Sequence, residues 1–157
     1  DLGGFIDLSL GGVPWEDIYQ RLLPPDLNQI SVEQMRSMIS MGHPEWDKEG
    51  IEATLANLKE LDDGTMERRL PIKKHMQIVR HMFDQSMKEL YSSMSDPVLI
   101  CAAGPDEQPD DQKQTLLDNA REIQQSTQHW FPNTDHDIHV HRPERLSEVI
   151  LTWLNSI

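Results

Sequence analysis

The stretch PVLICAA, Pro97–Ala103, decides the fold, and the loop GPDEQPDDQ, Gly104–Gln112, follows it directly. A continuous apolar run that contains branched residues is typical of a strand covered on both faces in a parallel sheet. The proline and aspartate residues behind it are typical of a turn or loop. The stretch therefore predicts a buried strand whose carboxyl end opens into a long polar loop.

The chain after this loop predicts a helix, a short strand and a last helix. Pro109 is expected to open the first helix, HWF at His129–Phe131 makes the strand, and Pro143 begins the last helix. A strand, a helix and a second strand with short connections form two parallel neighbours with a right-handed crossover. Residues 96–157 are therefore predicted to be a β-α-β-α segment of an α/β fold. The apolar positions expected to face inward on the two helices are Leu116, Leu117, Ala120 and Ile123, then Leu146, Val149, Ile150, Trp153 and Leu154.

The chain before Asp96 predicts mainly helices. All eight methionines lie there, between Met35 and Met94. They are interpreted either as flexible core filler or as an adaptable apolar ceiling over a ligand cavity. Four helices are expected in this stretch. The first begins at Pro14, and the second begins at a capping box formed by Ser31 and Gln34. The third begins after Asp47 and ends at Leu61, and the fourth runs from Pro71 to Leu90.

Composition bounds the class of protein. The chain has 157 residues, the size of one ordinary domain, and a formal net charge of −13 from 27 acidic and 14 basic side chains. This charge repels phosphate backbones and anionic lipid surfaces, so we expect neither nucleic acid nor a membrane as partner. Cys101 is the single cysteine, which suits a reducing compartment. Because no apolar run approaches the ~20 residues of a membrane span and no signal-peptide pattern occurs, a cytoplasmic location is expected.

The turn TDHDIHVHRPER, Thr134–Arg145, is rich in histidine. Residues 135–142 of this turn contain three imidazoles and two aspartates, which suit a zinc or iron site, a surface loop, or the presentation of one catalytic imidazole. Alternation in an extended segment points His139 and His141 to one face and leaves His136 elsewhere. No fourth ligand is evident in the sequence. A metal site is therefore the weaker interpretation, and no cofactor is expected.

Residues from Asp96 onward, DPVLICAAGPDEQPDD and then HWFPNTDHDIHVHRPERLSEVILTWL, resemble the end of an α/β-hydrolase. In that family a penultimate strand with an acid loop, a helix, the last strand, a histidine loop and a final helix follow in this order. The helical stretch before them resembles the cap, or lid, that many of these enzymes insert after the sixth strand. The resemblance implies an α/β fold with a mainly helical cap at 14–95, a core segment at 96–157, and a lead-in from the preceding core strand at 1–13.

The resemblance also implies roles for single residues. A serine hydroxyl attacks only when a base takes its proton and a carboxylate orients that base. His136 matches the family's base, with His139 as the reserve, and Asp106 matches its acid. The other candidate acids are Asp110 and an aspartate near the end of the preceding strand, Asp1 or Asp7.

The family's nucleophile motif, G-x-S-x-G, does not occur in the sequence. The nearest match, DLSLG at Asp7–Gly11 with Ser9 in its middle, has aspartate in place of the first glycine and runs on into Gly-Gly-Val-Pro rather than a helix. We therefore expect that the nucleophile precedes this sequence, which would be the second half of a hydrolase and inactive by itself. The expected substrate is a small molecule with an apolar part that contains an ester, amide or similar bond.

A narrow sheet of two parallel strands leaves an open edge. We therefore expect the chain to associate with itself or with the missing amino-terminal half, through the PVLICAA edge or the underside of the lid. The alternative is a non-catalytic protein-interaction module, which explains the missing nucleophile without truncation. The upstream coding sequence discriminates between the two hypotheses.

Overall fold

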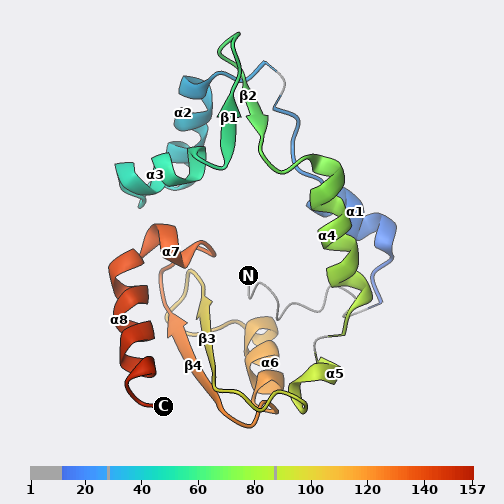
Figure 1. Cartoon of the computed structure of the whole chain (residues 1–157), viewed down its shortest axis with the longest axis vertical. Helices are drawn as coiled ribbons and strands as arrows, with labels where there is room; N and C mark the ends of the chain where they lie inside the picture. The colour runs from blue at the N-terminus through green and yellow to red at the C-terminus, as the bar shows by residue number, and fades with distance from the viewer. Residues whose placement is uncertain (1–11, 28, 87) are drawn as a thin grey trace. The chain divides into compact units, whose positions relative to one another are not determined.

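The computed structural model describes residues 12–27, 29–86 and 88–157. The backbone divides this part of the chain into two compact units. We call Pro14–Arg80 the helical unit, and residues 12–13 with His81–Ile157 the α/β unit. Figure 1 shows the helices and strands of each unit. None of the helices in the described ranges is both long enough and apolar enough to cross a bilayer.

The helical unit begins with two helices whose starts are set locally. α1, Trp15–Leu22, follows Pro14, a residue that is tolerated at a helix start because no intrahelical donor is needed there. α2, Val32–Gly42, has a full capping box, in which Ser31 Oγ accepts from the Gln34 N–H at 3.2 Å and Gln34 Oε1 accepts from the Ser31 N–H at 2.9 Å. Both predicted helix starts are confirmed.

α3, Lys48–Leu55, is also capped as predicted. The Asp47 carboxylate accepts a hydrogen bond from the Gly50 N–H at 2.7 Å. An ion pair joins α3 to α2, with 2.7 Å between Arg36 Nε and Glu52 Oε1. The hydrogen bond between these side chains lowers the pKa of the Glu52 carboxyl below its usual value. The two helices are thus linked by a pair of exposed charges.

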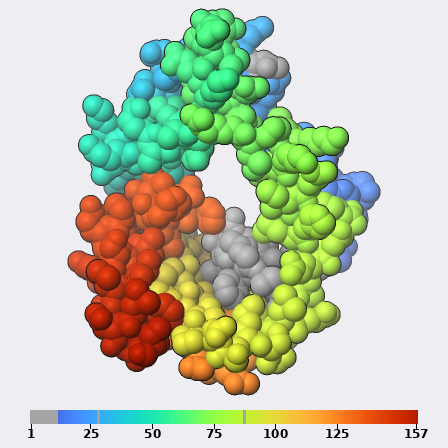
Figure 2. Space-filling model, viewed as in Figure 1, coloured from blue at the N-terminus to red at the C-terminus, as the bar shows by residue number. Residues whose placement is uncertain are grey.

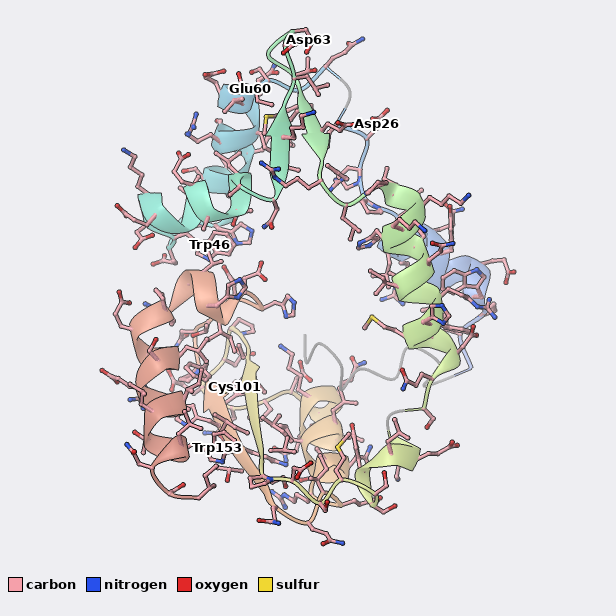
Figure 3. All side chains as sticks on the ribbon, viewed as in Figure 1. Asp26, Trp46, Glu60, Asp63, Cys101 and Trp153 are labelled. Atoms are coloured by element: carbon pink, nitrogen blue, oxygen red, sulfur yellow. The ribbon has the colours of Figure 1, made fainter. Side chains whose placement is uncertain are left out.

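The predicted extension of this third helix to Leu61 is wrong. The chain forms an antiparallel hairpin of β1, Leu58–Glu60, and β2, Met66–Arg68. Asp63 and Gly64 lie in the turn that joins these strands, and Figure 3 labels Asp63 at the tip of the hairpin. One oxygen of the Asp63 carboxylate accepts from both Thr65 N–H and Thr65 Oγ1–H, at 3.0 and 2.6 Å. Such side-chain bonds to the following backbone stabilise a turn at the expense of a helix.

One apolar cluster of the helical unit contains two methionines. Four residues of this cluster are buried, and the partly buried side chains around them are Ile30 and residues of α2, α3 and β1. Met38 and Met41 lie outside this cluster, with exposed fractions of 50% and 73%. Methionine therefore fills two positions of this cluster, whereas Met38 and Met41 lie at the surface. The four buried residues are Leu27, Met35, Leu55 and Met66.

The long helix predicted from Pro71 to Leu90 is two helices. α4, Ile72–Asp84, starts after Pro71 as predicted and buries Met76 and Val79. α5, Lys88–Tyr91, is a separate short turn. The prediction of one continuous helix is therefore wrong, because apolar spacing alone does not register a break of a few residues.

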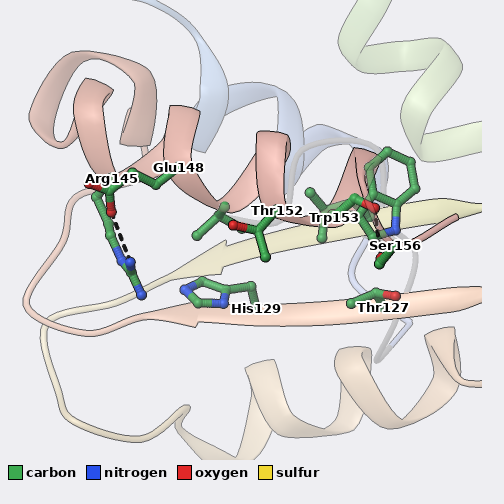
Figure 4. A pocket seen from close by; sticks show the side chains of 9 residues that line it. Thr127, His129, Arg145, Glu148, Thr152, Trp153 and Ser156 are labelled. Atoms are coloured by element: carbon green, nitrogen blue, oxygen red, sulfur yellow. Dashed lines mark hydrogen bonds and ion pairs between the residues drawn. The ribbon is translucent and has the colours of Figure 1, made fainter.

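The α/β unit has the predicted β-α-β-α order, with one added helical turn. β3, Val98–Ala103, and β4, Ser126–Phe131, pair in parallel and in register along their whole length. α6, Asp111–Ala120, connects them, and α7, Ile138–His141, and α8, Pro143–Leu154, follow β4. Figures 1 and 4 show α6 on one face of this two-stranded sheet and α8 on the other. The strand predicted at PVLICAA is thus covered on both faces.

Alternate residues of β3 pack into two separate apolar clusters. Ile100 and Ala102 pack with α6 residues, whereas Ala103 packs with Phe131, Ile138 and Val149 on the α7 and α8 side. This alternation follows from the two-residue period of a strand. The continuous apolar run PVLICAA therefore reflects the burial of β3 on both faces of the sheet.

Two predictions for the end of the chain are wrong. HDIHVH was expected to be extended, but Ile138–His141 is helical. α8 buries Val149, whereas Ile150 and Leu154, predicted to face inward, are 37% and 50% exposed. α8 is the red segment whose surface is visible in Figure 2.

Candidate active site

The loops that follow β3 and β4 are joined by main-chain hydrogen bonds. The Gly104 N–H donates to the Phe131 carbonyl at 3.2 Å, and the Thr134 N–H donates to the Gly104 carbonyl at 3.0 Å. Thr134 is only 4% exposed, and its hydroxyl donates to the Pro132 carbonyl at 2.8 Å. The loop with Asp106 and the turn with His136 therefore start from one rigid point at the carboxyl ends of the parallel strands.

His136 lies at the surface of this turn, just before α7. The His136 carbonyl accepts from the N–H of Ile138, whose side chain is buried, so the turn is anchored in the α/β unit. Partial burial is the main cause that lowers the pKa of His136; among the described side chains, Asp137 opposes this shift, and Lys113 makes a smaller contribution that lowers the pKa. A lowered pKa keeps the imidazole neutral at neutral pH, which is the form that accepts a proton.

Asp106 lies in the loop after β3 and is exposed. Its main-chain carbonyl accepts from Trp130 Nε1–H on β4 at 3.2 Å, which holds this loop beside the end of β4. Within the described residues, no hydrogen bond or ion pair links the Asp106 carboxylate to His136. Asp106 as the acid and His136 as the base therefore stay predictions, with both loops at the same end of the sheet.

Asp110, another candidate acid, is the N-cap residue of α6. One of its carboxylate oxygens accepts from the Lys113 N–H at 2.8 Å and so caps α6, which begins at Asp111 rather than at Pro109. This carboxylate is thus partly committed to the helix. The remaining candidates, Asp1, Asp7 and the serine at position 9, lie outside the described residues.

His139 and His141 have different surroundings on α7. His139 is exposed, whereas the His141 side chain is only 3% exposed. The Asp135 N–H donates to His141 Nδ1 at 3.0 Å, which closes the turn around His136. In the neutral ring the proton must then be on Nε2. Sequence reasoning missed this contact because the alternating pattern gave no sign of a helical turn.

The helical geometry of α7 also bears on the metal interpretation. Neighbours two apart on a helix lie about 200° apart around its axis, so His139 and His141 do not share a face. In the described ranges, no group of three or more histidine, cysteine, aspartate or glutamate side chains is arranged to hold a metal ion. The metal interpretation gains no support from this part of the chain.

Cys101 of β3 is not placed for nucleophilic attack. It packs against the cluster that contains Phe131 and Val149, and Figure 3 labels it on the strand. Burial raises the pKa of its thiol, which disfavours the reactive thiolate.

A pocket of about 330 Å³ lies between β4 and α8, apart from the predicted site residues (Figure 4). Inside it, Arg145 and Glu148 pair with each other at 3.0 Å. Burial, and then the charge of Arg145, lowers the pKa of His129. The lowered pKa favours the neutral form of His129, and the charges of Arg145 and Glu148 offset each other in their ion pair. These three side chains together therefore bring no net charge to the pocket. Its other lining residues are Leu99, Thr127, Val149, Thr152, Trp153 and Ser156.

No protein-family model and no curated protein matches the sequence. Among solved structures, the chain is similar to that of E-2-(acetamidomethylene)succinate hydrolase, with a TM-score of 0.64 and 15% identity over 80% of this chain and 46% of that one. It is also similar to a marine microorganism esterase, with a TM-score of 0.45 and 14% identity over 88% of this chain and 51% of that one. The chain thus spans about half the length of these two proteins. With its parallel β3–α6–β4 unit and covering α8, the chain has the fold of part of an α/β-hydrolase.

Proposed function

We propose that this chain supplies the base, the acid and the substrate-covering cap of a hydrolase that cleaves an ester, amide or similar bond. The observation that carries the proposal is the pair of main-chain bonds through Gly104, which start the Asp106 loop and the His136 turn from one point. Groups delivered by adjacent strand ends in an α/β sheet converge on the site where ligands bind. The neutral state favoured for His136 suits a general base.

In the proposed reaction, His136 takes the proton of an attacking hydroxyl as that oxygen adds to the substrate carbonyl. The imidazolium then returns the proton to the leaving oxygen or nitrogen as its bond to carbon breaks. Water, deprotonated by the same ring, releases the acyl group. Asp106 orients the ring, and the attacking group is proposed to lie in polypeptide equivalent to the part of the hydrolase that this chain does not cover.

Residues 14–95 are proposed to be the cap over the substrate. Met38 and Met41 lie three residues apart on α2, so they share a face, and both are exposed. Methionine side chains adapt to apolar ligands of varied shape. A small-molecule substrate with an apolar part, near these methionines and Trp15 or Trp46, is therefore proposed.

The proposed partner is a further strand-containing polypeptide. Among the described residues β3 and β4 form a sheet of two strands, and each has one edge without a strand partner there. We propose that the amino-terminal half of the hydrolase, or a second copy of the chain, covers such an edge. The net charge of −13 supports the proposal that neither nucleic acid nor a membrane is a partner. A cytoplasmic location is proposed on the single cysteine, Cys101, which suits a reducing compartment.

The test is turnover by the complete protein, which includes any upstream segment, with p-nitrophenyl esters of short acids. We expect His136→Ala to reduce kcat/KM by at least ~10³-fold, because loss of a triad member removes most of the rate enhancement. His139→Ala, which removes an exposed imidazole from the same turn, is the matched control and should retain turnover. Equal losses in both variants, or an active His136→Ala protein, contradict the assignment. A complete protein with no nucleophile motif and no turnover would support the interaction module instead.

A further inference from the structure

His141 is a buried histidine at the end of α7. Its side chain is only 3% exposed, and α7, Ile138–His141, is a single helical turn. A buried polar ring is costly unless its nitrogens have hydrogen-bond partners. The Asp135 N–H, six residues earlier in the chain, donates to His141 Nδ1 at 3.0 Å. The ring of His141 therefore connects the end of α7 to the residue directly before His136.

The contact between Asp135 and His141 is a hydrogen bond to a neutral ring. Asp135 Oδ2 lies 3.7 Å from the same Nδ1, a distance that makes an ion pair only if this nitrogen carries a proton. A nitrogen that accepts the main-chain N–H carries no proton, so the two interactions exclude each other. The shorter contact, at 3.0 Å, identifies Nδ1 as the acceptor and places the proton of the neutral ring on Nε2.

The turn that carries His136 begins α7 without the usual side-chain cap. In the described ranges, the side chain of Asp137 makes no capping hydrogen bond, although aspartate is a common cap residue. On the other side of His136, the Thr134 N–H is bonded to the Gly104 carbonyl at 3.0 Å, next to the end of β3. The main chain before His136 is therefore attached to the sheet through Thr134 and to α7 through the ring of His141.

We propose that His141 is a positioning residue of the hydrolase site, which accepts the Asp135 N–H and so fixes the peptide from which the proposed base, His136, projects. A base displaced by about 1 Å loses much of its effect, because proton transfer requires it within hydrogen-bond reach of the attacking group. The catalytic meaning of this inference rests on the proposed function, whereas the hydrogen bond itself can be measured in a protein without turnover.

The direct test compares two replacements of His141 that have nearly the same shape. In His141→Asn the side-chain oxygen can take the position of Nδ1 and accept the Asp135 N–H, whereas His141→Leu has a methyl group there. Amide hydrogen exchange, followed by NMR, measures the protection of the Asp135 N–H. We expect His141→Leu to speed this exchange about tenfold, which corresponds to the loss of one ordinary hydrogen bond. His141→Asn should keep the exchange close to that of the wild type.

The Thr134 amide and an exposed histidine provide the controls. Exchange of the Thr134 N–H, which is bonded to Gly104, should stay unchanged in His141→Leu. His139→Leu, which replaces an exposed ring of α7, should leave the Asp135 amide unchanged. Equal exchange of the Asp135 amide in His141→Asn and His141→Leu, or equal acceleration of the Thr134 and Asp135 amides, overturns the proposal.

Should His141→Leu fail to fold, the ring of the wild-type protein answers the same question. Nitrogen NMR of the His141 imidazole shows which of its two nitrogens carries the proton. Above neutral pH we expect an unprotonated Nδ1 and a proton on Nε2. A proton on Nδ1 would face the Asp135 N–H with a second donor, and its detection would overturn the proposal.

The catalytic part is tested in the complete enzyme with the same p-nitrophenyl esters. We expect His141→Leu to lower kcat by about 10–100-fold with KM nearly unchanged, because the base is misplaced while the substrate pocket is intact. His141→Asn should restore most of kcat.

Three outcomes contradict the positioning role: an equal loss of kcat in His141→Leu and His141→Asn, a loss confined to KM, and full kcat in a His141→Leu protein whose Asp135 amide has lost its protection. A wild-type protein without turnover, in which His141 still protects the Asp135 amide, would contradict the hydrolase function and support the hydrogen bond.

Discussion

The helical unit and the α/β unit differ in what fills their cores. The main apolar cluster of the helical unit buries Leu27, Leu55 and two methionines, Met35 and Met66, beside a hairpin whose strands are three residues long. The α/β unit buries short, branched or aromatic side chains on both faces of β3. Methionine has several rotatable bonds and adapts to gaps, whereas branched side chains in a strand hold one arrangement. The core of the helical unit is therefore more adaptable, which suits a cap, whereas the core of the α/β unit is more rigid, which suits a sheet that carries a site.

The largest expected effect tests that contrast directly. Ile100, 2% exposed on β3, and Met35, 8% exposed on α2, are each replaced by alanine. We expect a loss of about 2–5 kcal/mol in the free energy of unfolding in each case, with Ile100→Ala near the upper end, because a strand cannot collapse into the cavity. Met35→Ala should fall near the lower end, because Met66 can relax into the space. Urea unfolding followed by circular dichroism measures both, and the reverse order would contradict the contrast.

A smaller effect is expected at Gly104. The Cβ atom of Gly104→Ala would clash with the Trp130 ring and so break the bond from Nε1 to the Asp106 carbonyl. Overpacking of this kind costs about 1–3 kcal/mol. Gly42→Ala in the helical unit is the matched control, because nothing lies within 4 Å of its Cβ position, and stability there should be unchanged or slightly higher. Equal losses at the two glycines would mean that the ring does not occupy the space over residue 104.

The smallest effect is a pH dependence confined to the α/β unit. His129 and His136 both have a pKa below the ordinary 6.5, mainly because of burial. The unfolded chain therefore binds more protons than the folded one in this range, so stability present above pH 6.5 is lost as the pH falls through the folded pKa values. The double variant His129→Gln, His136→Gln should flatten the slope of unfolding free energy between pH 7 and pH 5. A steeper slope would show that the sign is wrong.

The elements of the α/β unit were predictable because burial on both faces leaves a continuous apolar run, as at Val98–Ala103. The first strand of the hairpin, β1, was not predictable, because it is only three residues long and the helical spacing from Ile51 to Leu61 describes the same residues equally well. α7 was missed because four residues are too few to distinguish alternation from a helical turn.

The candidate site likewise combines features that leave a local signal in the sequence with features that do not. The strand before the His136 turn and the helix that Pro143 opens after it were predictable, because both leave local signals in the sequence. The grouping of Gly104, Lys113 and Trp130 is invisible in the sequence, since only the crossover of the parallel strands brings them together. The sequence does not determine which carboxylate lies nearest to His136, because that depends on side-chain placement.

The two bonds through Gly104 use only peptide groups. Side chains elsewhere in the two flanking loops, apart from position 104, can therefore change by mutation while these bonds keep the starts of the loops at the same spacing.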